Sequence, residues 1–350
     1  NYTQGYCTST ATGFTATTTG LFTGSKNFIY MAIRGEMMKE PESATEVYNA
    51  ITRSGTGAVD TKVTGVGFSP DLLLSKAKNF AIDTGAWDRL RGFRALKTSS
   101  TVAETNPNNS LQSFDMDGYT TDNDTTNLLN AASSGQQYVN YFWKRAKGYF
   151  DAVAYTGDGV TGRAVEHSLG AVPEMIWVKN RITGNRAWQV YHKSLGITGR
   201  LELNDTLDGT ATVSHWTNTP TDAEFTVRNI GVLNGSGETY IAYLFATLAG
   251  ISKVGSYTGN GSNQTIDCGF TSGARFILIK RTDSAGDWYV WDSVRGIIAG
   301  NDPHLALNSV AAEVTTDDSV DPNSSGFIVN QVSATNINVS AAEYIFYAIA

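Results

Sequence analysis

The chain has 350 residues, of which 41% are hydrophobic and only 17% charged, and it carries a formal net charge of −7 at pH 7. This length and apolar content exclude a largely disordered chain and allow about two or three domains. Because the charge is negative and the one basic cluster spans only residues 143–147, we expect no nucleic-acid partner. No stretch reaches ~18 consecutive apolar residues, so no membrane insertion is expected.

Residue usage favours strands over helices. The 35 glycines occur among many Thr, Ser and Asn residues, a composition typical of short strands joined by turns. Cys7 and Cys268 lie far apart, so neither a disulfide framework nor a CxxC metal or redox motif is expected. We therefore predict an all-β chain.

The start of the chain resembles only the end of a later unit. Residues 13–17 and 28–33 match the last strands of the units that follow. We predict that residues 1–36 are the back half of an incomplete β-sandwich, because an isolated half-sandwich leaves apolar side chains in water. Its partner strands would lie upstream, in a neighbouring subunit or on the adjoining unit. Residues 36–47, which contain Pro41, predict a linker with at most a short turn of helix.

Recurring landmarks divide the rest of the chain. Aromatic, alternating segments recur at spacings of roughly 100 to 110 residues, and each predicts a buried strand that closes one unit. These segments are residues 27–33, 138–143, 240–246 and 344–350. A glycine-containing turn opens each full unit, and a strand that ends in Lys76, Lys179 or Lys280 follows. We expect a central core strand whose lysine emerges at the rim.

A tryptophan segment comes next in each unit. It spans residues 87–92, 188–196 and 288–296. The pattern Asp-x-x-Arg-Gly occurs in the first and third of these segments and is lost in the second. We expect a structural ion pair to hold the loop in each of the two. The pairs are Asp88 with Arg91 and Asp292 with Arg295.

Together these landmarks predict tandem antiparallel β-sandwiches, jelly-roll-like, of about 100 residues each. A late strand around Phe114, Phe225 or Phe327 precedes the closing strand and completes about six to eight strands per unit. The expected units are residues 37–146, 147–250 and 251–350.

Aromatic side chains of the later tryptophan segments are the candidates for ligand or receptor contact, since aromatic residues dominate interfaces. The candidates are Trp188, Tyr191, His192, Trp288, Tyr289 and Trp291. Alternation places Trp288 on one face of its strand and both Tyr289 and Trp291 on the other. Either one aromatic set is exposed, or the opposing sheet or a neighbouring unit buries both.

Other patterns favour structural roles. Gly157-x-Gly159-x-x-Gly162 matches a dinucleotide-binding motif but runs into a predicted strand rather than a helix, so no cofactor is expected. The four histidines lack zinc-ligand spacing, and no Gly-x-Ser-x-Gly motif accompanies them, so neither a metal site nor an enzyme is expected. The acidic residues of 115–124 and 317–321 offer oxygen ligands for calcium but match no EF-hand, and turns are the favoured role.

Several segments resemble a tandemly repeated domain of uncharacterised function from large virion proteins of tailed bacteriophages and their prophages. The resembling segments are residues 31–34, 63–68, 113–118, 240–246 and 253–261. The resemblance covers essentially the whole chain. It implies an external place on the virion, on the tail or an appendage, with other virion proteins as partners. It brings no active site with it.

We therefore expect a non-enzymatic phage virion protein, a tail-fibre or appendage module for host attachment through a surface glycan or protein. A homo-oligomer is expected, with a trimer favoured, because phage appendages commonly attach along symmetry axes. Two alternatives stay open. One is a purely architectural component, such as a capsid decoration or a tail or baseplate protein. The other is a host polysaccharide depolymerase, whose paired carboxylates would meet in space rather than in sequence.

Overall fold

A computed structural model describes residues 7–10, 13–16 and 38–350, apart from 107–108, 132–134 and 210–213. It contains two compact bodies, Asn1–Lys39 and Glu40–Ala350. In the Asn1–Lys39 body, β1 (Cys7–Thr10) pairs antiparallel with β2 (Gly13–Ala16). The predicted strand at residues 28–33, and with it most of the half-sandwich prediction, lies outside the described residues.

The described chain is nearly all β. In the described part of the predicted linker, Ala44–Glu46 forms a 3-10 turn, η2, capped by the Ser43 hydroxyl, which accepts a hydrogen bond from the Thr45 amide. No helix in the described part of the chain has the length and apolar character that a membrane span requires.

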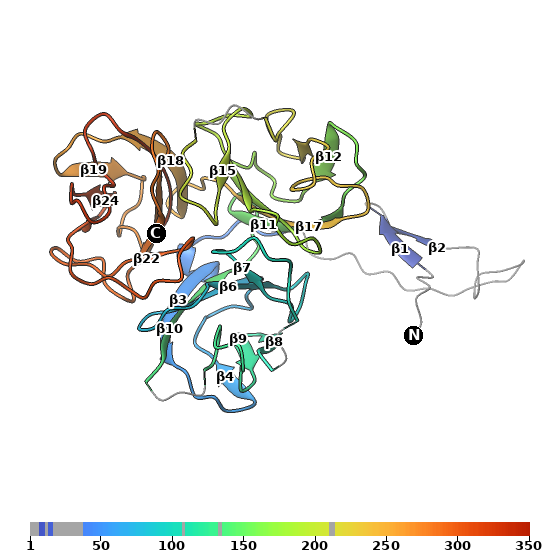
Figure 1. Ribbon diagram of the computed structural model, residues 1–350, viewed down its shortest axis with the longest axis horizontal. Coiled ribbons are helices and arrows are strands. Elements are labelled where there is room, and N and C mark those ends of the chain that lie inside the picture. The colour runs from blue at the N-terminus through green and yellow to red at the C-terminus, as the bar shows by residue number, and fades with distance from the viewer. Residues whose placement is uncertain (1–6, 11–12, 17–37, 107–108, 132–134, 210–213) are drawn as a thin grey trace, which may run out of the picture. The chain divides into compact units, whose positions relative to one another are not determined.

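Three five-stranded antiparallel sheets form the framework of Glu40–Ala350 (Figure 1). The first large sheet consists, in spatial order, of β3 (Tyr48–Ser54), β10 (Gln137–Trp143), β5 (Leu72–Ala77), β6 (Gly85–Asp88) and β7 (Leu96–Lys97). The second large sheet consists of β11 (Phe150–Thr156), β17 (Thr239–Phe245), β13 (Met175–Asn180), β14 (Gln189–His192) and β15 (Leu201–Glu202). The third large sheet consists of β18 (Ser252–Thr258), β25 (Glu343–Ile349), β20 (Phe276–Arg281), β21 (Trp288–Asp292) and β22 (Leu305–Ala306). All three large sheets have the same topology: the strand that comes last in the sequence lies between the first and the second strand of its sheet.

A small sheet accompanies each large one. The first small sheet contains β4 (Thr61–Val63), β9 (Gly118–Thr121) and β8 (Leu111–Asp115), the second contains β12 (Arg163–Glu166) and β16 (Glu224–Val227), and the third contains β19 (Gln264–Asp267), β24 (Gly326–Val329) and β23 (Val320–Asn323). A separate apolar core joins each small sheet to one face of its large sheet. The predicted all-β, sandwich-like fold class is confirmed.

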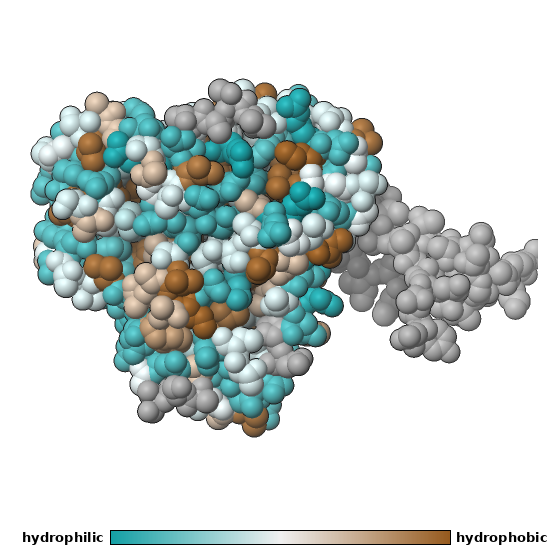
Figure 2. Space-filling model, viewed as in Figure 1, coloured by the Kyte–Doolittle hydropathy of each residue, from teal (hydrophilic) through white to brown (hydrophobic). Residues whose placement is uncertain are grey.

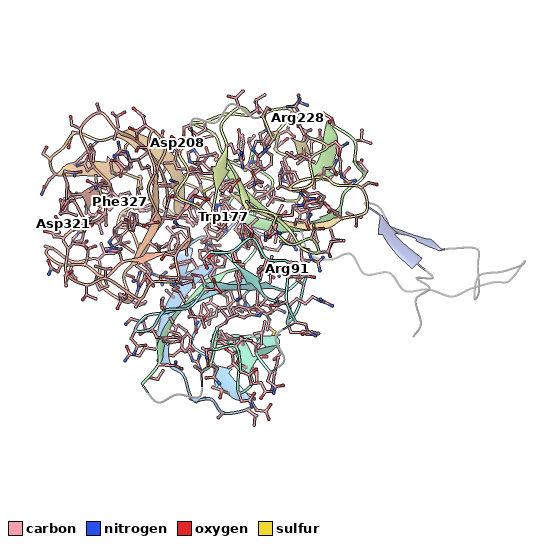
Figure 3. All side chains as sticks on the ribbon, in the orientation of Figure 1. Arg91, Trp177, Asp208, Arg228, Asp321 and Phe327 are labelled. Atoms are coloured by element: carbon pink, nitrogen blue, oxygen red, sulfur yellow. The ribbon has the colours of Figure 1, made fainter. Side chains whose placement is uncertain are left out.

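The other face of each large sheet belongs to one common core. Aromatic rings from different sheets touch there: the ring centroids of Trp143 and Phe276 lie 5.5 Å apart, and those of Phe245 and Tyr347 lie 5.0 Å apart. Figure 3 places Trp177 where the three large sheets meet. Because both faces of these sheets are buried, their central strands are continuous buried runs rather than alternating ones, as in β13 and β20.

Strand register gives the equivalent positions in the three units. Each lysine that ends the predicted core strand is the fifth residue of β5, β13 or β20 and pairs with the closing strand, at Val139, Ile241 and Ile345. In the small sheets, Val63, Val165 and Ile266 pair with Tyr119, Phe225 and Phe327. The predicted late strand around Phe114 is present as β8. The residue that corresponds in register to Phe225 and Phe327 is Tyr119, because β9 rather than β8 pairs with β4.

The three lysines do not emerge at the rim as predicted, because a neighbouring unit covers each strand end. All three side chains are buried, and each ammonium donates to one carbonyl of its own unit and one of another unit. The contacts between units are Lys76 Nζ to Ser309 O at 2.6 Å, Lys179 Nζ to Thr101 O at 3.0 Å and Lys280 Nζ to Thr206 O at 3.0 Å. The first unit thus donates to the third, the third to the second, and the second to the first, in a closed ring. Burial lowers the pKa of each lysine to about 8.

Candidate functional site

The tryptophan segments of the first and third units each hold a buried ion pair. Arg91 Nε donates to Asp88 Oδ2 at 2.5 Å, and Arg295 Nε donates to Asp292 Oδ2 at 2.5 Å, with all four side chains removed from solvent. The backbone amides of Arg91 and Arg295 also donate to the aspartate Oδ1 atoms, at 3.0 and 2.9 Å. Each aspartate therefore closes the loop that follows its strand, β6 or β21.

Each ion pair also binds a tyrosine from another unit. The Tyr243 hydroxyl donates to Asp88 Oδ2 at 2.7 Å and accepts from Arg91 Nη2 at 3.1 Å, while the Tyr141 hydroxyl donates to Asp292 Oδ2 at 2.9 Å. Burial raises the pKa of both tyrosines well above its usual value, so both remain protonated donors. The sequence predicted that the ion pair of the Asp-x-x-Arg motif holds its loop. In the structure, this ion pair also joins two units.

The second unit has no such ion pair at the equivalent positions. His192 stands in register where the other units have aspartate, and Leu195 takes the place of the arginine. The equivalent tyrosine from the third unit, Tyr347, makes no hydrogen bond of normal geometry among the described residues. Burial raises its pKa, and the nearby side chains of Tyr149 and Trp143 partly offset that shift. Burial lowers the pKa of His192 to about 3, so its ring is neutral at neutral pH.

Of the two alternatives that the sequence left open, burial holds for five of the six candidate contact residues. They are Trp188, Tyr191, His192, Trp288 and Trp291. Trp188 Nε1 donates to Lys97 O of the first unit at 2.8 Å, and Trp288 Nε1 donates to Glu202 O of the second unit at 2.9 Å. Tyr191 and Trp291 lie on the opposite faces of their sheets, in the cores shared with the small sheets. Both faces are covered because each large sheet is sandwiched between a small sheet and the common core.

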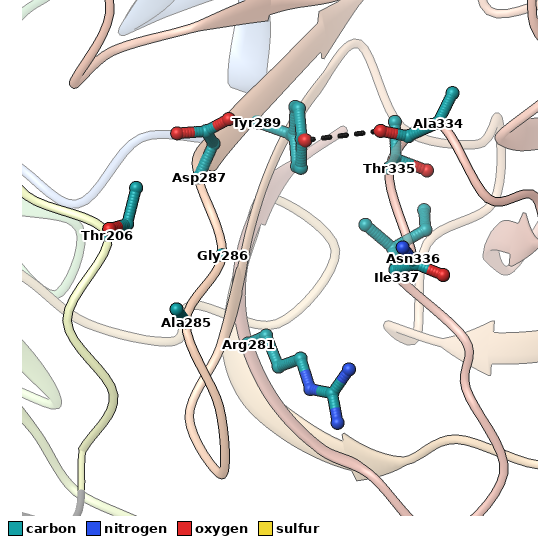
Figure 4. Close-up of a pocket in the computed structure, with 10 residues that line it drawn as sticks. All are labelled: Thr206, Arg281, Ala285, Gly286, Asp287, Tyr289, Ala334, Thr335, Asn336 and Ile337. Carbon is teal, nitrogen blue, oxygen red and sulfur yellow. Dashed lines mark hydrogen bonds between the residues drawn. The ribbon is translucent and has the colours of Figure 1, made fainter.

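Tyr289, the sixth candidate, stays partly exposed and lines a cavity of about 260 Å³ (Figure 4). In this view Tyr289 and Asp287 lie at one end of the cavity and Arg281 at the other, while Asn336 faces Thr206 across it. Four of these residues belong to the third unit, and Thr206 comes from the second. The second unit therefore contributes one residue to the wall of a cavity that the third unit otherwise forms.

Hydrogen bonds hold the polar side chains of this cavity in place. Arg281 donates to both oxygens of Asp283, at 2.8 and 3.1 Å, and lowers the pKa of that carboxyl. Asp287 Oδ1 accepts from Asn308 Nδ2 at 2.7 Å. Behind the wall, the ammonium of Lys280 donates to Gly286 O at 2.7 Å. These preset groups offer donors and acceptors whose orientation does not depend on a ligand.

The chemistry of the cavity is specific to the third unit. By register, Tyr289 corresponds to Gly85 in the first unit and Gln189 in the second. Arg281 corresponds likewise to Ala77 and Asn180. The alignment of repeats points out this unusual tyrosine, but the polar partners that it meets come from loops far apart in the sequence, and sequence reasoning missed them.

The acidic runs supply turns. Asp117 accepts from the backbone amides of Gly65 and Gly67, at 2.9 and 2.6 Å. In the third unit, Asn330 Nδ2 donates to both Asp318 and Asp321 at 2.9 Å. Among the described residues, no group of three or more His, Cys, Asp or Glu side chains is arranged to hold a metal ion.

A family model described as a domain of unknown function, DUF7483, matches residues 43–350. The chain belongs to the DUF7483 family. The matched range contains all three large sheets and the ring of lysine contacts that joins them, so the DUF7483 region corresponds to the whole three-unit body. No match was found among curated proteins.

Proposed function

We propose that this DUF7483 chain is a non-enzymatic attachment module of a tailed-bacteriophage virion, placed externally on the tail or an appendage. The resemblance of its sequence to virion-associated repeats supports the phage origin. The observation that carries the attachment role is the Tyr289 cavity, where an aromatic side chain and several oriented polar groups share one surface opening.

The rest of the body suits a rigid support for such a site. Three units share one core, and the lysine, tyrosine and tryptophan contacts between them use charged or polar groups that are almost entirely buried. A rigid support lowers the entropy lost on binding, because fewer groups must be ordered by the ligand. In the view of Figure 2 most of the body's surface is hydrophilic, with hydrophobic residues in small groups, which suits a site exposed to water.

The distribution of perturbed ionisable groups supports a non-enzymatic role. Strongly shifted pKa values often accompany catalytic groups. Here the shifted lysines and His192 form hydrogen bonds between or within units. Asp302, whose pKa burial raises to about 7, accepts hydrogen bonds from the backbone amides of Ser319 and Val320. Beside the cavity, Arg281 holds the pKa of Asp283 low, which keeps this carboxyl ionised and unsuited to general-acid catalysis.

Whole-cell adsorption tests the attachment role. The fluorescently labelled chain, shown by light scattering to be folded and in its native oligomeric state, is added to a panel of bacteria. We expect saturable binding to at least one strain, and the scattering measurement also tests the proposed trimer. Binding to no strain would count against attachment, and release of sugar from host polymer would contradict a non-enzymatic protein.

The closed ring of contacts also favours a second candidate, a purely architectural virion protein, because a body so tightly joined resists deformation. Virion reconstruction separates the two roles. A continuous lattice of chains favours architecture, whereas a distal position on an appendage favours attachment.

A further inference from the structure

We infer that the Tyr289 cavity binds one residue of a neutral sugar, a hexose unit within a host-surface glycan. This inference rests on the proposed attachment role and names its ligand. The cavity measures about 260 Å³, below the range of about 300 to 1,000 Å³ that is typical of sites for drug-sized molecules. A single sugar ring is a ligand of suitable size, whereas a folded partner would need a broader surface.

Charge balance favours a neutral ligand. Arg281 and Asp287 bring one charge of each sign to the cavity wall. Next to the wall, Asp283 pairs with Arg281, and the buried ammonium of Lys280 interacts with nearby aspartates, Asp287 among them. Arg281 already pairs with Asp283, so an acidic sugar would have to compete with a carboxylate that is in place. A neutral ligand requires no such exchange.

The hydrogen-bonding groups suit a ligand rich in hydroxyls. A guanidinium has five N–H donors, and Arg281 uses two of them on Asp283. The carboxylate of Asp287 has further acceptor sites beyond the one that Asn308 occupies. Because each sugar hydroxyl both donates and accepts, neighbouring hydroxyls can use the acceptor at Asp287 and the donors at Arg281 and Asn336.

Tyr289 supplies the apolar wall. Its hydroxyl donates to Ala334 O at 3.4 Å, and its ring meets those of His304 and Trp291 at centroid distances of 5.3 and 5.9 Å. These contacts hold the ring before a ligand arrives. A fixed aromatic face offers contact area to the C–H face of a sugar at low entropic cost.

Thr206, a residue of the second unit, forms part of the cavity wall. Thr206 O accepts from the Gly286 amide at 3.0 Å and from Lys280 Nζ at 3.0 Å. Both donors belong to the third unit, so the contact that joins the units also fixes the shape of the cavity. The inference therefore concerns the intact three-unit body rather than an isolated unit.

The test measures binding of the methyl glycosides of glucose, galactose and mannose to the full chain by ligand-observed NMR and calorimetry. We expect at least one to bind, and we expect Tyr289→Ala and Asp287→Asn each to weaken that binding at least tenfold. Tyr289→Phe keeps the ring and should retain binding within about threefold. Phe93→Ala removes an aromatic side chain of the first unit that is 51% exposed, and it should change nothing.

Three outcomes would overturn the inference: no binding of any neutral glycoside, binding of sialic or uronic acids alone, or neutral-sugar binding that Tyr289→Ala leaves intact. Circular dichroism and thermal melting of each variant show that a loss of binding is not a loss of folding. The attachment role is judged separately. Cell adsorption that survives Tyr289→Ala would overturn the sugar site and leave attachment standing, whereas sugar binding without cell adsorption would contradict attachment.

Discussion

Three tyrosines at equivalent positions make unequal contacts, and replacing each with phenylalanine should give unequal losses of stability. The Tyr243 hydroxyl bonds both members of the Asp88–Arg91 pair, at 2.7 and 3.1 Å. The buried Tyr347 hydroxyl lies near the side chains of Tyr149 and Trp143, and it makes no hydrogen bond of normal geometry among the described residues. The same single-atom deletion therefore removes two hydrogen bonds at Tyr243 and none of normal geometry at Tyr347.

The magnitude follows from the charge of the partners. A hydrogen bond to a charged group contributes roughly 1.5 to 3 kcal/mol to the free energy of unfolding. We expect Tyr243→Phe to lower that free energy by about this amount, because Asp88 keeps its bonds to Arg91 and is not left unpaired. Tyr347→Phe should change it by less than about 0.5 kcal/mol, or raise it slightly, since it removes a buried hydroxyl with poor hydrogen bonding.

Urea denaturation followed by tryptophan fluorescence measures both changes, with thermal melting as a second assay. For a body of this size, roughly 2 °C of melting temperature is lost per kcal/mol, so Tyr243→Phe should melt about 3 to 6 °C lower. Tyr141→Phe, whose hydroxyl bonds Asp292, provides the internal control and should resemble Tyr243→Phe. Equal losses for Tyr347→Phe and Tyr243→Phe would refute the reasoning that these contacts join the units.

Asn234→Ala should lower the free energy of unfolding by about 2 to 3 kcal/mol in urea titration, because its buried amide bonds both the backbone and the side chain of Asp158. A loss below 1 kcal/mol would show that the turn does not depend on it. Burial raises the pKa of Asp302 from 3.8 to about 7, so the unfolded chain releases this proton first and stability should fall as pH rises from about 4 to 7. The melting temperature of Asp302→Asn should therefore change less across this pH range than that of the unsubstituted protein. An equal change with pH in both proteins would assign the pH dependence to other groups. His192→Asp alone should destabilise by leaving a buried carboxylate without a cation, and adding Leu195→Arg should restore stability. A double-mutant cycle with no coupling energy would contradict this.

The sequence alone predicted the strands, because strand formation depends on short-range patterns. Aromatic and β-branched runs predicted β10, β17 and β25, and the register of Lys76, Lys179 and Lys280 in the structure matches the spacing that the repeats suggested. The all-β class followed from the same patterns and from the glycine-rich turns. The Asp-x-x-Arg motif likewise brings its two side chains together across three residues, a distance that local geometry controls.

Tertiary structure decided which of these side chains meet solvent. Lys76 lies near the end of β5 and Trp188 directly before β14, and either position could face an open rim. Both are buried because other units cover them, with backbone carbonyls at Ser309 and Lys97 within hydrogen-bonding distance. The Tyr289 cavity depends in the same way on Thr206, some 80 residues earlier in the chain. The alternation of side chains along a strand shows which residues share a face, but it does not show what covers each face. That depends on packing among three units, whose contacts join residues that no local pattern connects.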